Sequence, residues 1–180
     1  MNTLIASLAL LQAAPAAVVP AVTSPPPSPP ACDTPAHAAF DFWVGEWDVF
    51  ANGSDQQVAR STIERLYNGC AIRENWNPLR GGPGGSLNSL DPATGRWHQT
   101  WIGSSPGRVE FVGGPVAGKM VLTGYWAGVG PNGEDGLIRM TYTPNEDFSV
   151  RQHGELSLDH GLTWSDSFDF IYRPHKEAPQ

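Results

Sequence analysis

Residues 90–102, LDPATGRWHQTWI, contain a tight turn followed by a strongly alternating run of side chains. Pro and Gly occupy positions in the first half that are typical of a reverse turn. In residues 96–102, Trp97, Gln99 and Trp101 share one face, because side chains alternate between the two faces of a β-strand. The stretch therefore predicts a hairpin whose second strand has an aromatic face and a polar face.

Similar short runs, separated by Gly, Pro, Asn and Asp, continue through the chain from residue 40 onward. We expect about ten strands, and we place them at residues 47–51, 58–67, 71–76, 85–90, 96–102, 108–112, 119–126, 136–143, 149–158 and 163–173. Before them, residues 35–42 are expected to form one short turn of helix. Hairpins in series form a meander, and closure of a meander removes its exposed edges. The pattern predicts an all-β fold, an antiparallel up-and-down β-barrel of about ten strands, with a β-sandwich as the alternative.

The N-terminal residues are typical of a secretion signal. Residues 4–11 are apolar but too short to span a bilayer, and Ala14-Pro15-Ala16 offers the small-x-small spacing of a cleavage site. We expect an exported protein, periplasmic or secreted, that is not inserted in a membrane after cleavage. Its expected parts are a signal peptide at 1–16, a Pro-rich spacer at 17–32, a β-barrel domain at 33–175 and a tail at 176–180.

Charge and cysteine content restrict the partners and the compartment. The net charge is −7, and the 11 Lys and Arg residues form no basic run. Nucleic acids and anionic membrane surfaces require a positive footprint, so neither is expected as a partner. In an exported protein the pair Cys32 and Cys70 predicts one disulfide, with two free thiols as the alternative.

Residues 40–49, FDFWVGEWDV, carry a resemblance to a known class of barrels. Gly45-x-Trp47 resembles the entry motif of the calycins, which include lipocalins and nitrobindin-like barrels. With its flanking residues the segment is similar to a family of exported bacterial proteins of unknown function that begins Phe-Asp-Phe-Trp-x-Gly-x-Trp. The resemblance implies that Trp47 fills the barrel floor and that Arg173 packs over it. It implies a fold and little about function.

Residues 157–164, SLDHGLTW, match the Asp box of sialidases at every defined position. We interpret this single copy as a turn stabiliser, because a sialidase needs a propeller far longer than this chain. Asp159 is expected to accept hydrogen bonds within the turn, Gly161 to adopt a positive φ, and Trp164 to cover the loop.

The alternation of several strands predicts a mixed interior. In residues 71–76, Glu74 and Trp76 share a face, and we expect the tryptophan-bearing faces to point inward. An aromatic interior with a few polar groups is typical of a small-molecule site, although a structural polar network is an equal alternative. The candidate ligand-binding residues are Glu74, Trp76, Trp97, Gln99, Trp101, Arg139 and Gln152.

Histidines and cofactors give no strong signal. None of the five histidines has the spacing of a zinc site, so no metal site is expected. Nitrobindin-like barrels hold haem through one axial histidine, which keeps haem open as an alternative to no cofactor. However, the alternation places His98 and His153 on the outer face.

Three functions remain after these exclusions. The preferred hypothesis is a barrel that binds a small, partly apolar molecule, and whether the chain is an enzyme stays open. If it is one, Glu74 is the candidate catalytic residue, a general acid or base in a cofactor-free isomerase, lyase or hydratase, because burial raises a carboxyl pKa. The third is a barrel surface that meets another protein. The ligand and the oligomeric state are not indicated.

Overall fold

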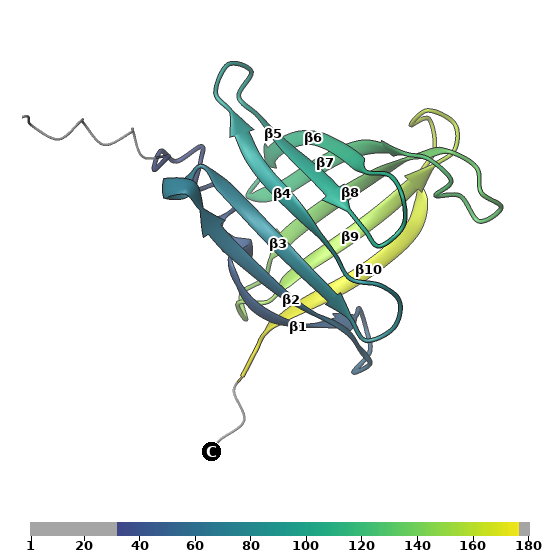
Figure 1. The fold of residues 1–180 in the computed structure, drawn as a ribbon, viewed down its shortest axis with the longest axis horizontal. Coiled ribbons are helices and arrows are strands. Elements are labelled where there is room, and N and C mark those ends of the chain that lie inside the picture. The colour runs from purple at the N-terminus through teal and green to yellow at the C-terminus, as the bar shows by residue number, and fades with distance from the viewer. Residues whose placement is uncertain (1–31, 177–180) are drawn as a thin grey trace, which may run out of the picture. The chain divides into compact units, whose positions relative to one another are not determined.

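The computed structural model describes residues 32–176. Ten antiparallel strands close into a barrel in which each strand pairs with its sequence neighbours and β1 pairs with β10 (Figure 1). The predicted all-β up-and-down barrel is therefore confirmed, and the sandwich alternative is wrong. The predicted signal peptide, and the spacer except for Cys32, lie outside the described residues.

Every predicted strand has a counterpart in the barrel. The strands are β1 (Gly45–Ala51), β2 (Gln57–Leu66), β3 (Ala71–Pro78), β4 (Gly84–Asp91), β5 (Arg96–Ile102), β6 (Val109–Val116), β7 (Lys119–Trp126), β8 (Gly136–Pro144), β9 (Val150–Ser157) and β10 (Ser165–Pro174), with 3₁₀ turns η1 (Asp41–Trp43) and η2 (Tyr67–Gly69). Most strand boundaries differ from expectation by one or more residues, and two of these differences have a clear physical reason. Tyr67 leaves the strand because it has a positive φ of 53° and opens η2. β6 continues past Gly113, where the absent Cβ leaves room for the backbone carbonyl of Val121 on β7.

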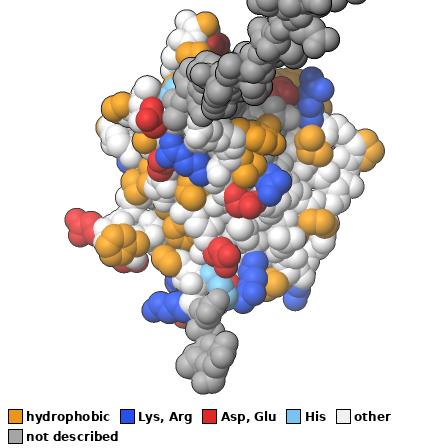
Figure 2. All heavy atoms as spheres, turned by 60° about the vertical axis from the view of Figure 1, so that its left-hand side comes forward, with side chains coloured by type: hydrophobic (Ala, Val, Ile, Leu, Met, Phe, Trp, Pro, Cys, Tyr) orange, Lys and Arg blue, Asp and Glu red, His pale blue; other side chains and the backbone are white. Residues whose placement is uncertain are grey.

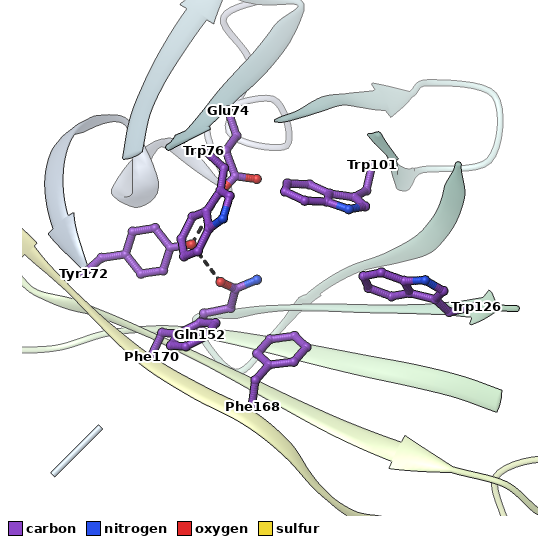
Figure 3. Close-up of a pocket in the computed structure, with 8 residues that line it drawn as sticks. All are labelled: Glu74, Trp76, Trp101, Trp126, Gln152, Phe168, Phe170 and Tyr172. Atoms are coloured by element: carbon purple, nitrogen blue, oxygen red, sulfur yellow. Dashed lines mark hydrogen bonds between the residues drawn. The ribbon is translucent and has the colours of Figure 1, made fainter. Parts of the chain in front are cut away.

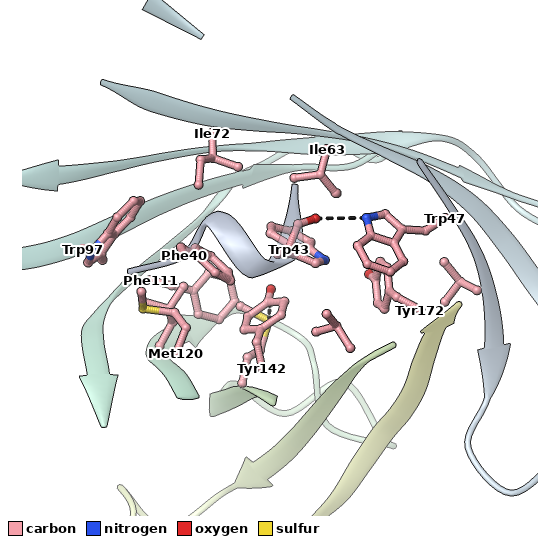
Figure 4. Close-up of a cluster of buried hydrophobic side chains, with 14 of the residues drawn as sticks. Phe40, Trp43, Trp47, Ile63, Ile72, Trp97, Phe111, Met120, Tyr142 and Tyr172 are labelled. Atoms are coloured by element: carbon pink, nitrogen blue, oxygen red, sulfur yellow. Dashed lines mark hydrogen bonds between the residues drawn. The ribbon is translucent and has the colours of Figure 1, made fainter. Parts of the chain in front are cut away.

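The described residues that precede β1 enter one end of the barrel and fill it (Figure 4). Phe40 and Trp43 are fully buried, and their rings stack with centroids 4.9 Å apart. Both rings contact Tyr142 of β8, at 5.0 and 4.9 Å. The carbonyl of Trp43 accepts a 2.9 Å hydrogen bond from the indole N–H of Trp47. We call this end of the barrel the closed end and residues 33–44 the plug.

The calycin-like pairing of Arg173 with Trp47 does not occur. The guanidinium of Arg173 lies over the ring of Phe50, 4.3 Å from its centroid, on the outside of the barrel. Arg173 pairs in register with Asp48, one position beyond Trp47, so it faces away from the interior. Trp47 instead packs against Tyr172 and the plug.

A disulfide fastens the start of the plug to the barrel. Cys32 and Cys70 are bonded, as predicted, which joins the first described residue to the residue after η2. The amide of Cys32 also donates to the carbonyl of Asn68 at 3.1 Å, and its carbonyl accepts from Arg65 at 2.8 Å. These bonds hold the plug against the closed end.

The Asp-box segment between β9 and β10 is the turn that its sequence predicts. Asp159 accepts hydrogen bonds from the backbone amide and the hydroxyl of Thr163, at 2.8 and 2.7 Å, and from Ser157 at 2.8 Å. These bonds hold the pKa of the Asp159 carboxyl at about 2. Gly161 has a φ of 90°, and the indole N–H of Trp164 donates to its carbonyl.

Figure 2 shows one face of the molecule, on which acidic and basic side chains are interspersed and hydrophobic side chains are scattered. Charged residues pair across neighbouring strands, as Arg73 does with Glu64 at 2.6 Å. Such exposed pairs add little stability. Within residues 32–176, no helix has the length and apolarity needed to cross a membrane.

Candidate functional site

A cavity of about 210 Å³ lies inside the barrel and is walled by aromatic rings (Figure 3). Each of its tryptophans lies near the end of a strand that runs away from the plug, so the cavity opens at the end opposite the plug. These tryptophans are half-buried, as are the two phenylalanines, which places the rings at the mouth. The lining residues are Glu74, Trp76, Trp101, Trp126, Gln152, Phe168, Phe170 and Tyr172.

The floor of the cavity contains one ionisable acid. Glu74 is 4% exposed, and its Oε2 accepts a 3.0 Å hydrogen bond from the hydroxyl of Ser86. Its Oε1 has only longer contacts, at 3.4 Å, to the hydroxyls of Ser61 and Tyr172. All three partners are neutral hydroxyls, so nothing on the floor compensates a charge on Glu74.

A chain of amides and hydroxyls continues from Glu74 across the barrel. Tyr172 donates to Gln152 Oε1 at 2.8 Å, and Gln152 Nε2 donates to the hydroxyl of Tyr142 at 3.0 Å. The amide of Gln99 donates to Asn88 Oδ1 at 2.7 Å and lies 3.4 Å from the same Tyr142 hydroxyl. The network satisfies the buried polar atoms that an apolar core would leave unpaired.

Burial dominates the acid–base properties of this network. It raises the pKa of Glu74 to about 7, and the hydrogen bonds from Ser86, Tyr172 and Ser61 only partly oppose it. Burial likewise raises the pKa of Tyr142 and Tyr172 above the ordinary value, and the nearby Glu74 carboxyl adds to the effect. Glu74 is therefore the group of this cavity that changes charge near neutral pH.

Four of the seven predicted ligand-binding residues line the cavity, namely Glu74, Trp76, Trp101 and Gln152. Gln99 is buried behind the floor in the polar network. Trp97 points inward as predicted, but it lies at the closed end, where its ring contacts Phe40 and its indole N–H donates to the carbonyl of Ala36. It is part of the core rather than of the cavity wall.

The expectation that Arg139 points inward is wrong. Ile138, Met140 and Tyr142 occupy the inner face of β8, so Arg139 falls on the outer face. There it makes two hydrogen bonds to Glu155, at 2.8 and 2.9 Å, and its guanidinium lies 4.2 Å from the centroid of the Trp164 ring.

Four aromatic residues of the cavity were not predicted. Phe168, Phe170 and Tyr172 alternate along β10, and Trp126 ends the inner face of β7. The alternation of side chains that places Trp101 on an inner face also places these four residues on inner faces. What the sequence did not indicate is the bulge between Asp166 and Phe168, which sets the register of β10 against β9.

Gly154 on β9 makes room for one wall of the cavity. It faces Phe168 across the β9–β10 pair, and a Cβ at this position would collide with the phenyl ring. We expect Gly154→Ala to lower the free energy of unfolding by about 1–2 kcal/mol and to push the ring toward the mouth. Urea denaturation measures the first effect and a crystal structure the second.

Gly114→Ala is the matched control, because a Cβ there meets nothing within 4 Å. Its effect is expected to stay within about 0.5 kcal/mol. Equal losses in the two variants would show that the approach of Phe168 does not constrain Gly154.

The histidines lie away from the cavity. His153 contacts Asp166 on the outer face at 2.8 Å, and His98 is exposed. Among the residues that the structure describes, no group of three or more His, Cys, Asp or Glu side chains is arranged to hold a metal ion. His98 and His153 thus both lie on the outer face, as the alternation of their strands predicts.

Comparison with known proteins does not identify a relative. No model of a known protein family matches the chain, and no curated protein matches it. The fold is consistent with a calycin-like barrel. The cavity is therefore the feature of this protein that points to a function.

Proposed function

We propose that this protein is an exported barrel that binds a small, partly apolar molecule in the cavity opposite the plug. One observation carries the proposal: a cavity with aromatic walls and a polar floor opens at one end of a barrel whose other end is filled. Sites for small molecules have this composition, with a few polar groups that orient the ligand. The Cys32–Cys70 disulfide supports export, because such bonds persist in oxidising compartments.

Intrinsic fluorescence tests this function directly, because three of the seven tryptophans line the cavity. Titration of the mature protein with a library of lipophilic compounds is expected to give saturable changes in emission. Trp101→Phe should remove much of the change for a bound compound and raise its Kd by about fivefold.

Trp164→Phe is the control, because Trp164 lies under Arg139 on the outer face. It should leave the Kd unchanged. A library that gives no saturable change in wild-type emission would contradict the binding function, as would equal effects of the two substitutions.

The second candidate is a cofactor-free isomerase, lyase or hydratase, and the raised pKa of Glu74 favours it. The position of Arg139 on the outer face weakens this candidate, because the described residues that line the cavity then include no cationic side chain to stabilise a developing anion. Glu74→Gln discriminates the two: loss of a measured turnover with retained binding indicates an enzyme.

A further inference from the structure

The walls of the cavity are suited to a cation. Six of its eight lining residues are aromatic: Trp76, Trp101, Trp126, Phe168, Phe170 and Tyr172. In Figure 3 these rings surround one space from several strands. The faces of aromatic rings carry negative potential, and Trp attracts cations most strongly. Several rings around one site therefore favour a positively charged group.

The floor adds a carboxyl group that lacks a cationic partner. Among residues 32–176, the side chains that line the cavity include no Lys, Arg or His. Glu74 Oε1 has only contacts of 3.4 Å, so it keeps hydrogen-bonding capacity for a ligand. Figure 3 shows the carboxyl group directed into the space between the rings. A buried carboxylate is strongly unfavourable unless it is paired, and a bound cation would pair it.

The charges around the mouth agree with this reading. The loops that join the strands at this end carry four acids, Asp55, Glu134, Asp135 and Asp159, against two arginines, Arg80 and Arg108, and Asp55 is paired with Arg173. Arg80 and Arg108 line the depressions that flank the cavity, not the cavity itself. With a net charge of −7, the chain as a whole also attracts cations.

We propose that the ligand is an organic ammonium ion, held between the aromatic rings with its charge against Glu74. This inference rests on the proposed binding function and names the chemical class of the ligand. The substituents of the ammonium group would contact the tryptophan faces. Its longer arm would leave through the mouth, because the cavity volume of about 210 Å³ fits a head group rather than a large molecule.

Isothermal titration calorimetry with matched probes tests this proposal. The ammonium probes are choline, tetraethylammonium and benzyltrimethylammonium, and the neutral probe is 3,3-dimethylbutan-1-ol, which has the shape of choline. At pH 8, at least one ammonium probe is expected to bind, with a Kd at least about tenfold below that of the neutral alcohol. Glu74→Gln should raise the Kd of that probe at least about tenfold and so remove most of its preference over the neutral alcohol.

Proton release gives a second readout that does not depend on affinity. At pH 6 most Glu74 side chains are protonated in the free protein, because burial raises the pKa of this carboxyl to about 7. An ammonium ion favours the charged carboxylate, so binding at pH 6 should release close to one proton. The groups that face Glu74 from β2, β4, β8 and β10 are Ser61, Ser86, Tyr142 and Tyr172, which stay neutral at this pH. Titrations in buffers of different ionisation enthalpy measure the release.

Glu46→Gln is the control for the change in net charge, because Glu46 is exposed on β1. It should leave the Kd and the proton release unchanged. Equal Kd values for choline and the neutral alcohol, or no binding of any ammonium probe, would overturn the ammonium proposal. If compounds of the lipophilic library still bind in either case, the proposed binding function stands, whereas a failure of all of them overturns both.

Discussion

Trp43→Ala is expected to lower the free energy of unfolding by about 3–5 kcal/mol, the range for truncation of a buried large aromatic residue. Trp43 is fully buried and contacts Phe40, Tyr142 and Tyr172 at ring-centroid distances between 4.9 and 5.9 Å. Its removal leaves a large void at the closed end, which the surrounding strands cannot fill without breaking their pairing. Urea denaturation followed by circular dichroism measures the loss.

Two further variants test whether the void left by the Trp43 side chain accounts for the loss of stability. In the part of the chain that the structure describes, the indole N–H of Trp43 has no hydrogen-bond partner. Trp43→Phe therefore loses volume but no hydrogen bond, and its loss should be clearly smaller. Phe148→Ala removes a ring that is 82% exposed and should change stability by less than about 0.5 kcal/mol. A loss for Trp43→Ala no larger than that for Phe148→Ala would contradict the role of the plug.

The barrel was predictable because its signals are local. Side chains alternate within residues 90–102 and within similar runs, and Gly and Pro separate these runs. Neighbouring residues alone therefore predict the strands and hairpins. The plug was harder to predict, because η1 has only three residues and its burial depends on Tyr142, about a hundred residues away in the chain. A short apolar segment of this kind carries no period that identifies its partner.

Part of the candidate site was also predictable from the local alternation of side chains. Glu74 and Trp101 were found because tryptophans mark the inner faces of their strands. Arg139 lies on the outer face, contrary to the prediction, because Ile138 and Met140 alternate with it on the inner face, and no tryptophan marks that face of β8. Distances such as that from Glu74 to Tyr172 depend on barrel closure, which joins residues 98 positions apart.

Relative to its Glu74→Gln variant, the wild-type protein is expected to lose about 3 kcal/mol of stability between pH 4 and pH 8. The pKa of Glu74 rises from 4.5 to about 7 on folding because the carboxyl is buried. Well below pH 4.5 the carboxyl is protonated in both states, so its burial carries no ionisation penalty. As the pH rises toward 7 the unfolded chain releases this proton while the folded chain keeps it, and stability falls. Above about 7 both states are ionised and the difference stays constant.

Urea denaturation of both proteins at several pH values measures this difference, and subtraction removes the titration of the other carboxyl groups. Two curves that run parallel from pH 4 to pH 8 would show that folding does not perturb Glu74. A glutamine side chain can accept hydrogen bonds from Ser86 and its neighbours without ionising, so the fold itself gains nothing from a carboxyl group above neutral pH. A residue that destabilises its own fold at working pH is expected where its charge acts on a ligand. An ammonium ion that pairs with Glu74 would recover part of the lost stability, which connects the pH dependence of folding to the occupancy of the cavity.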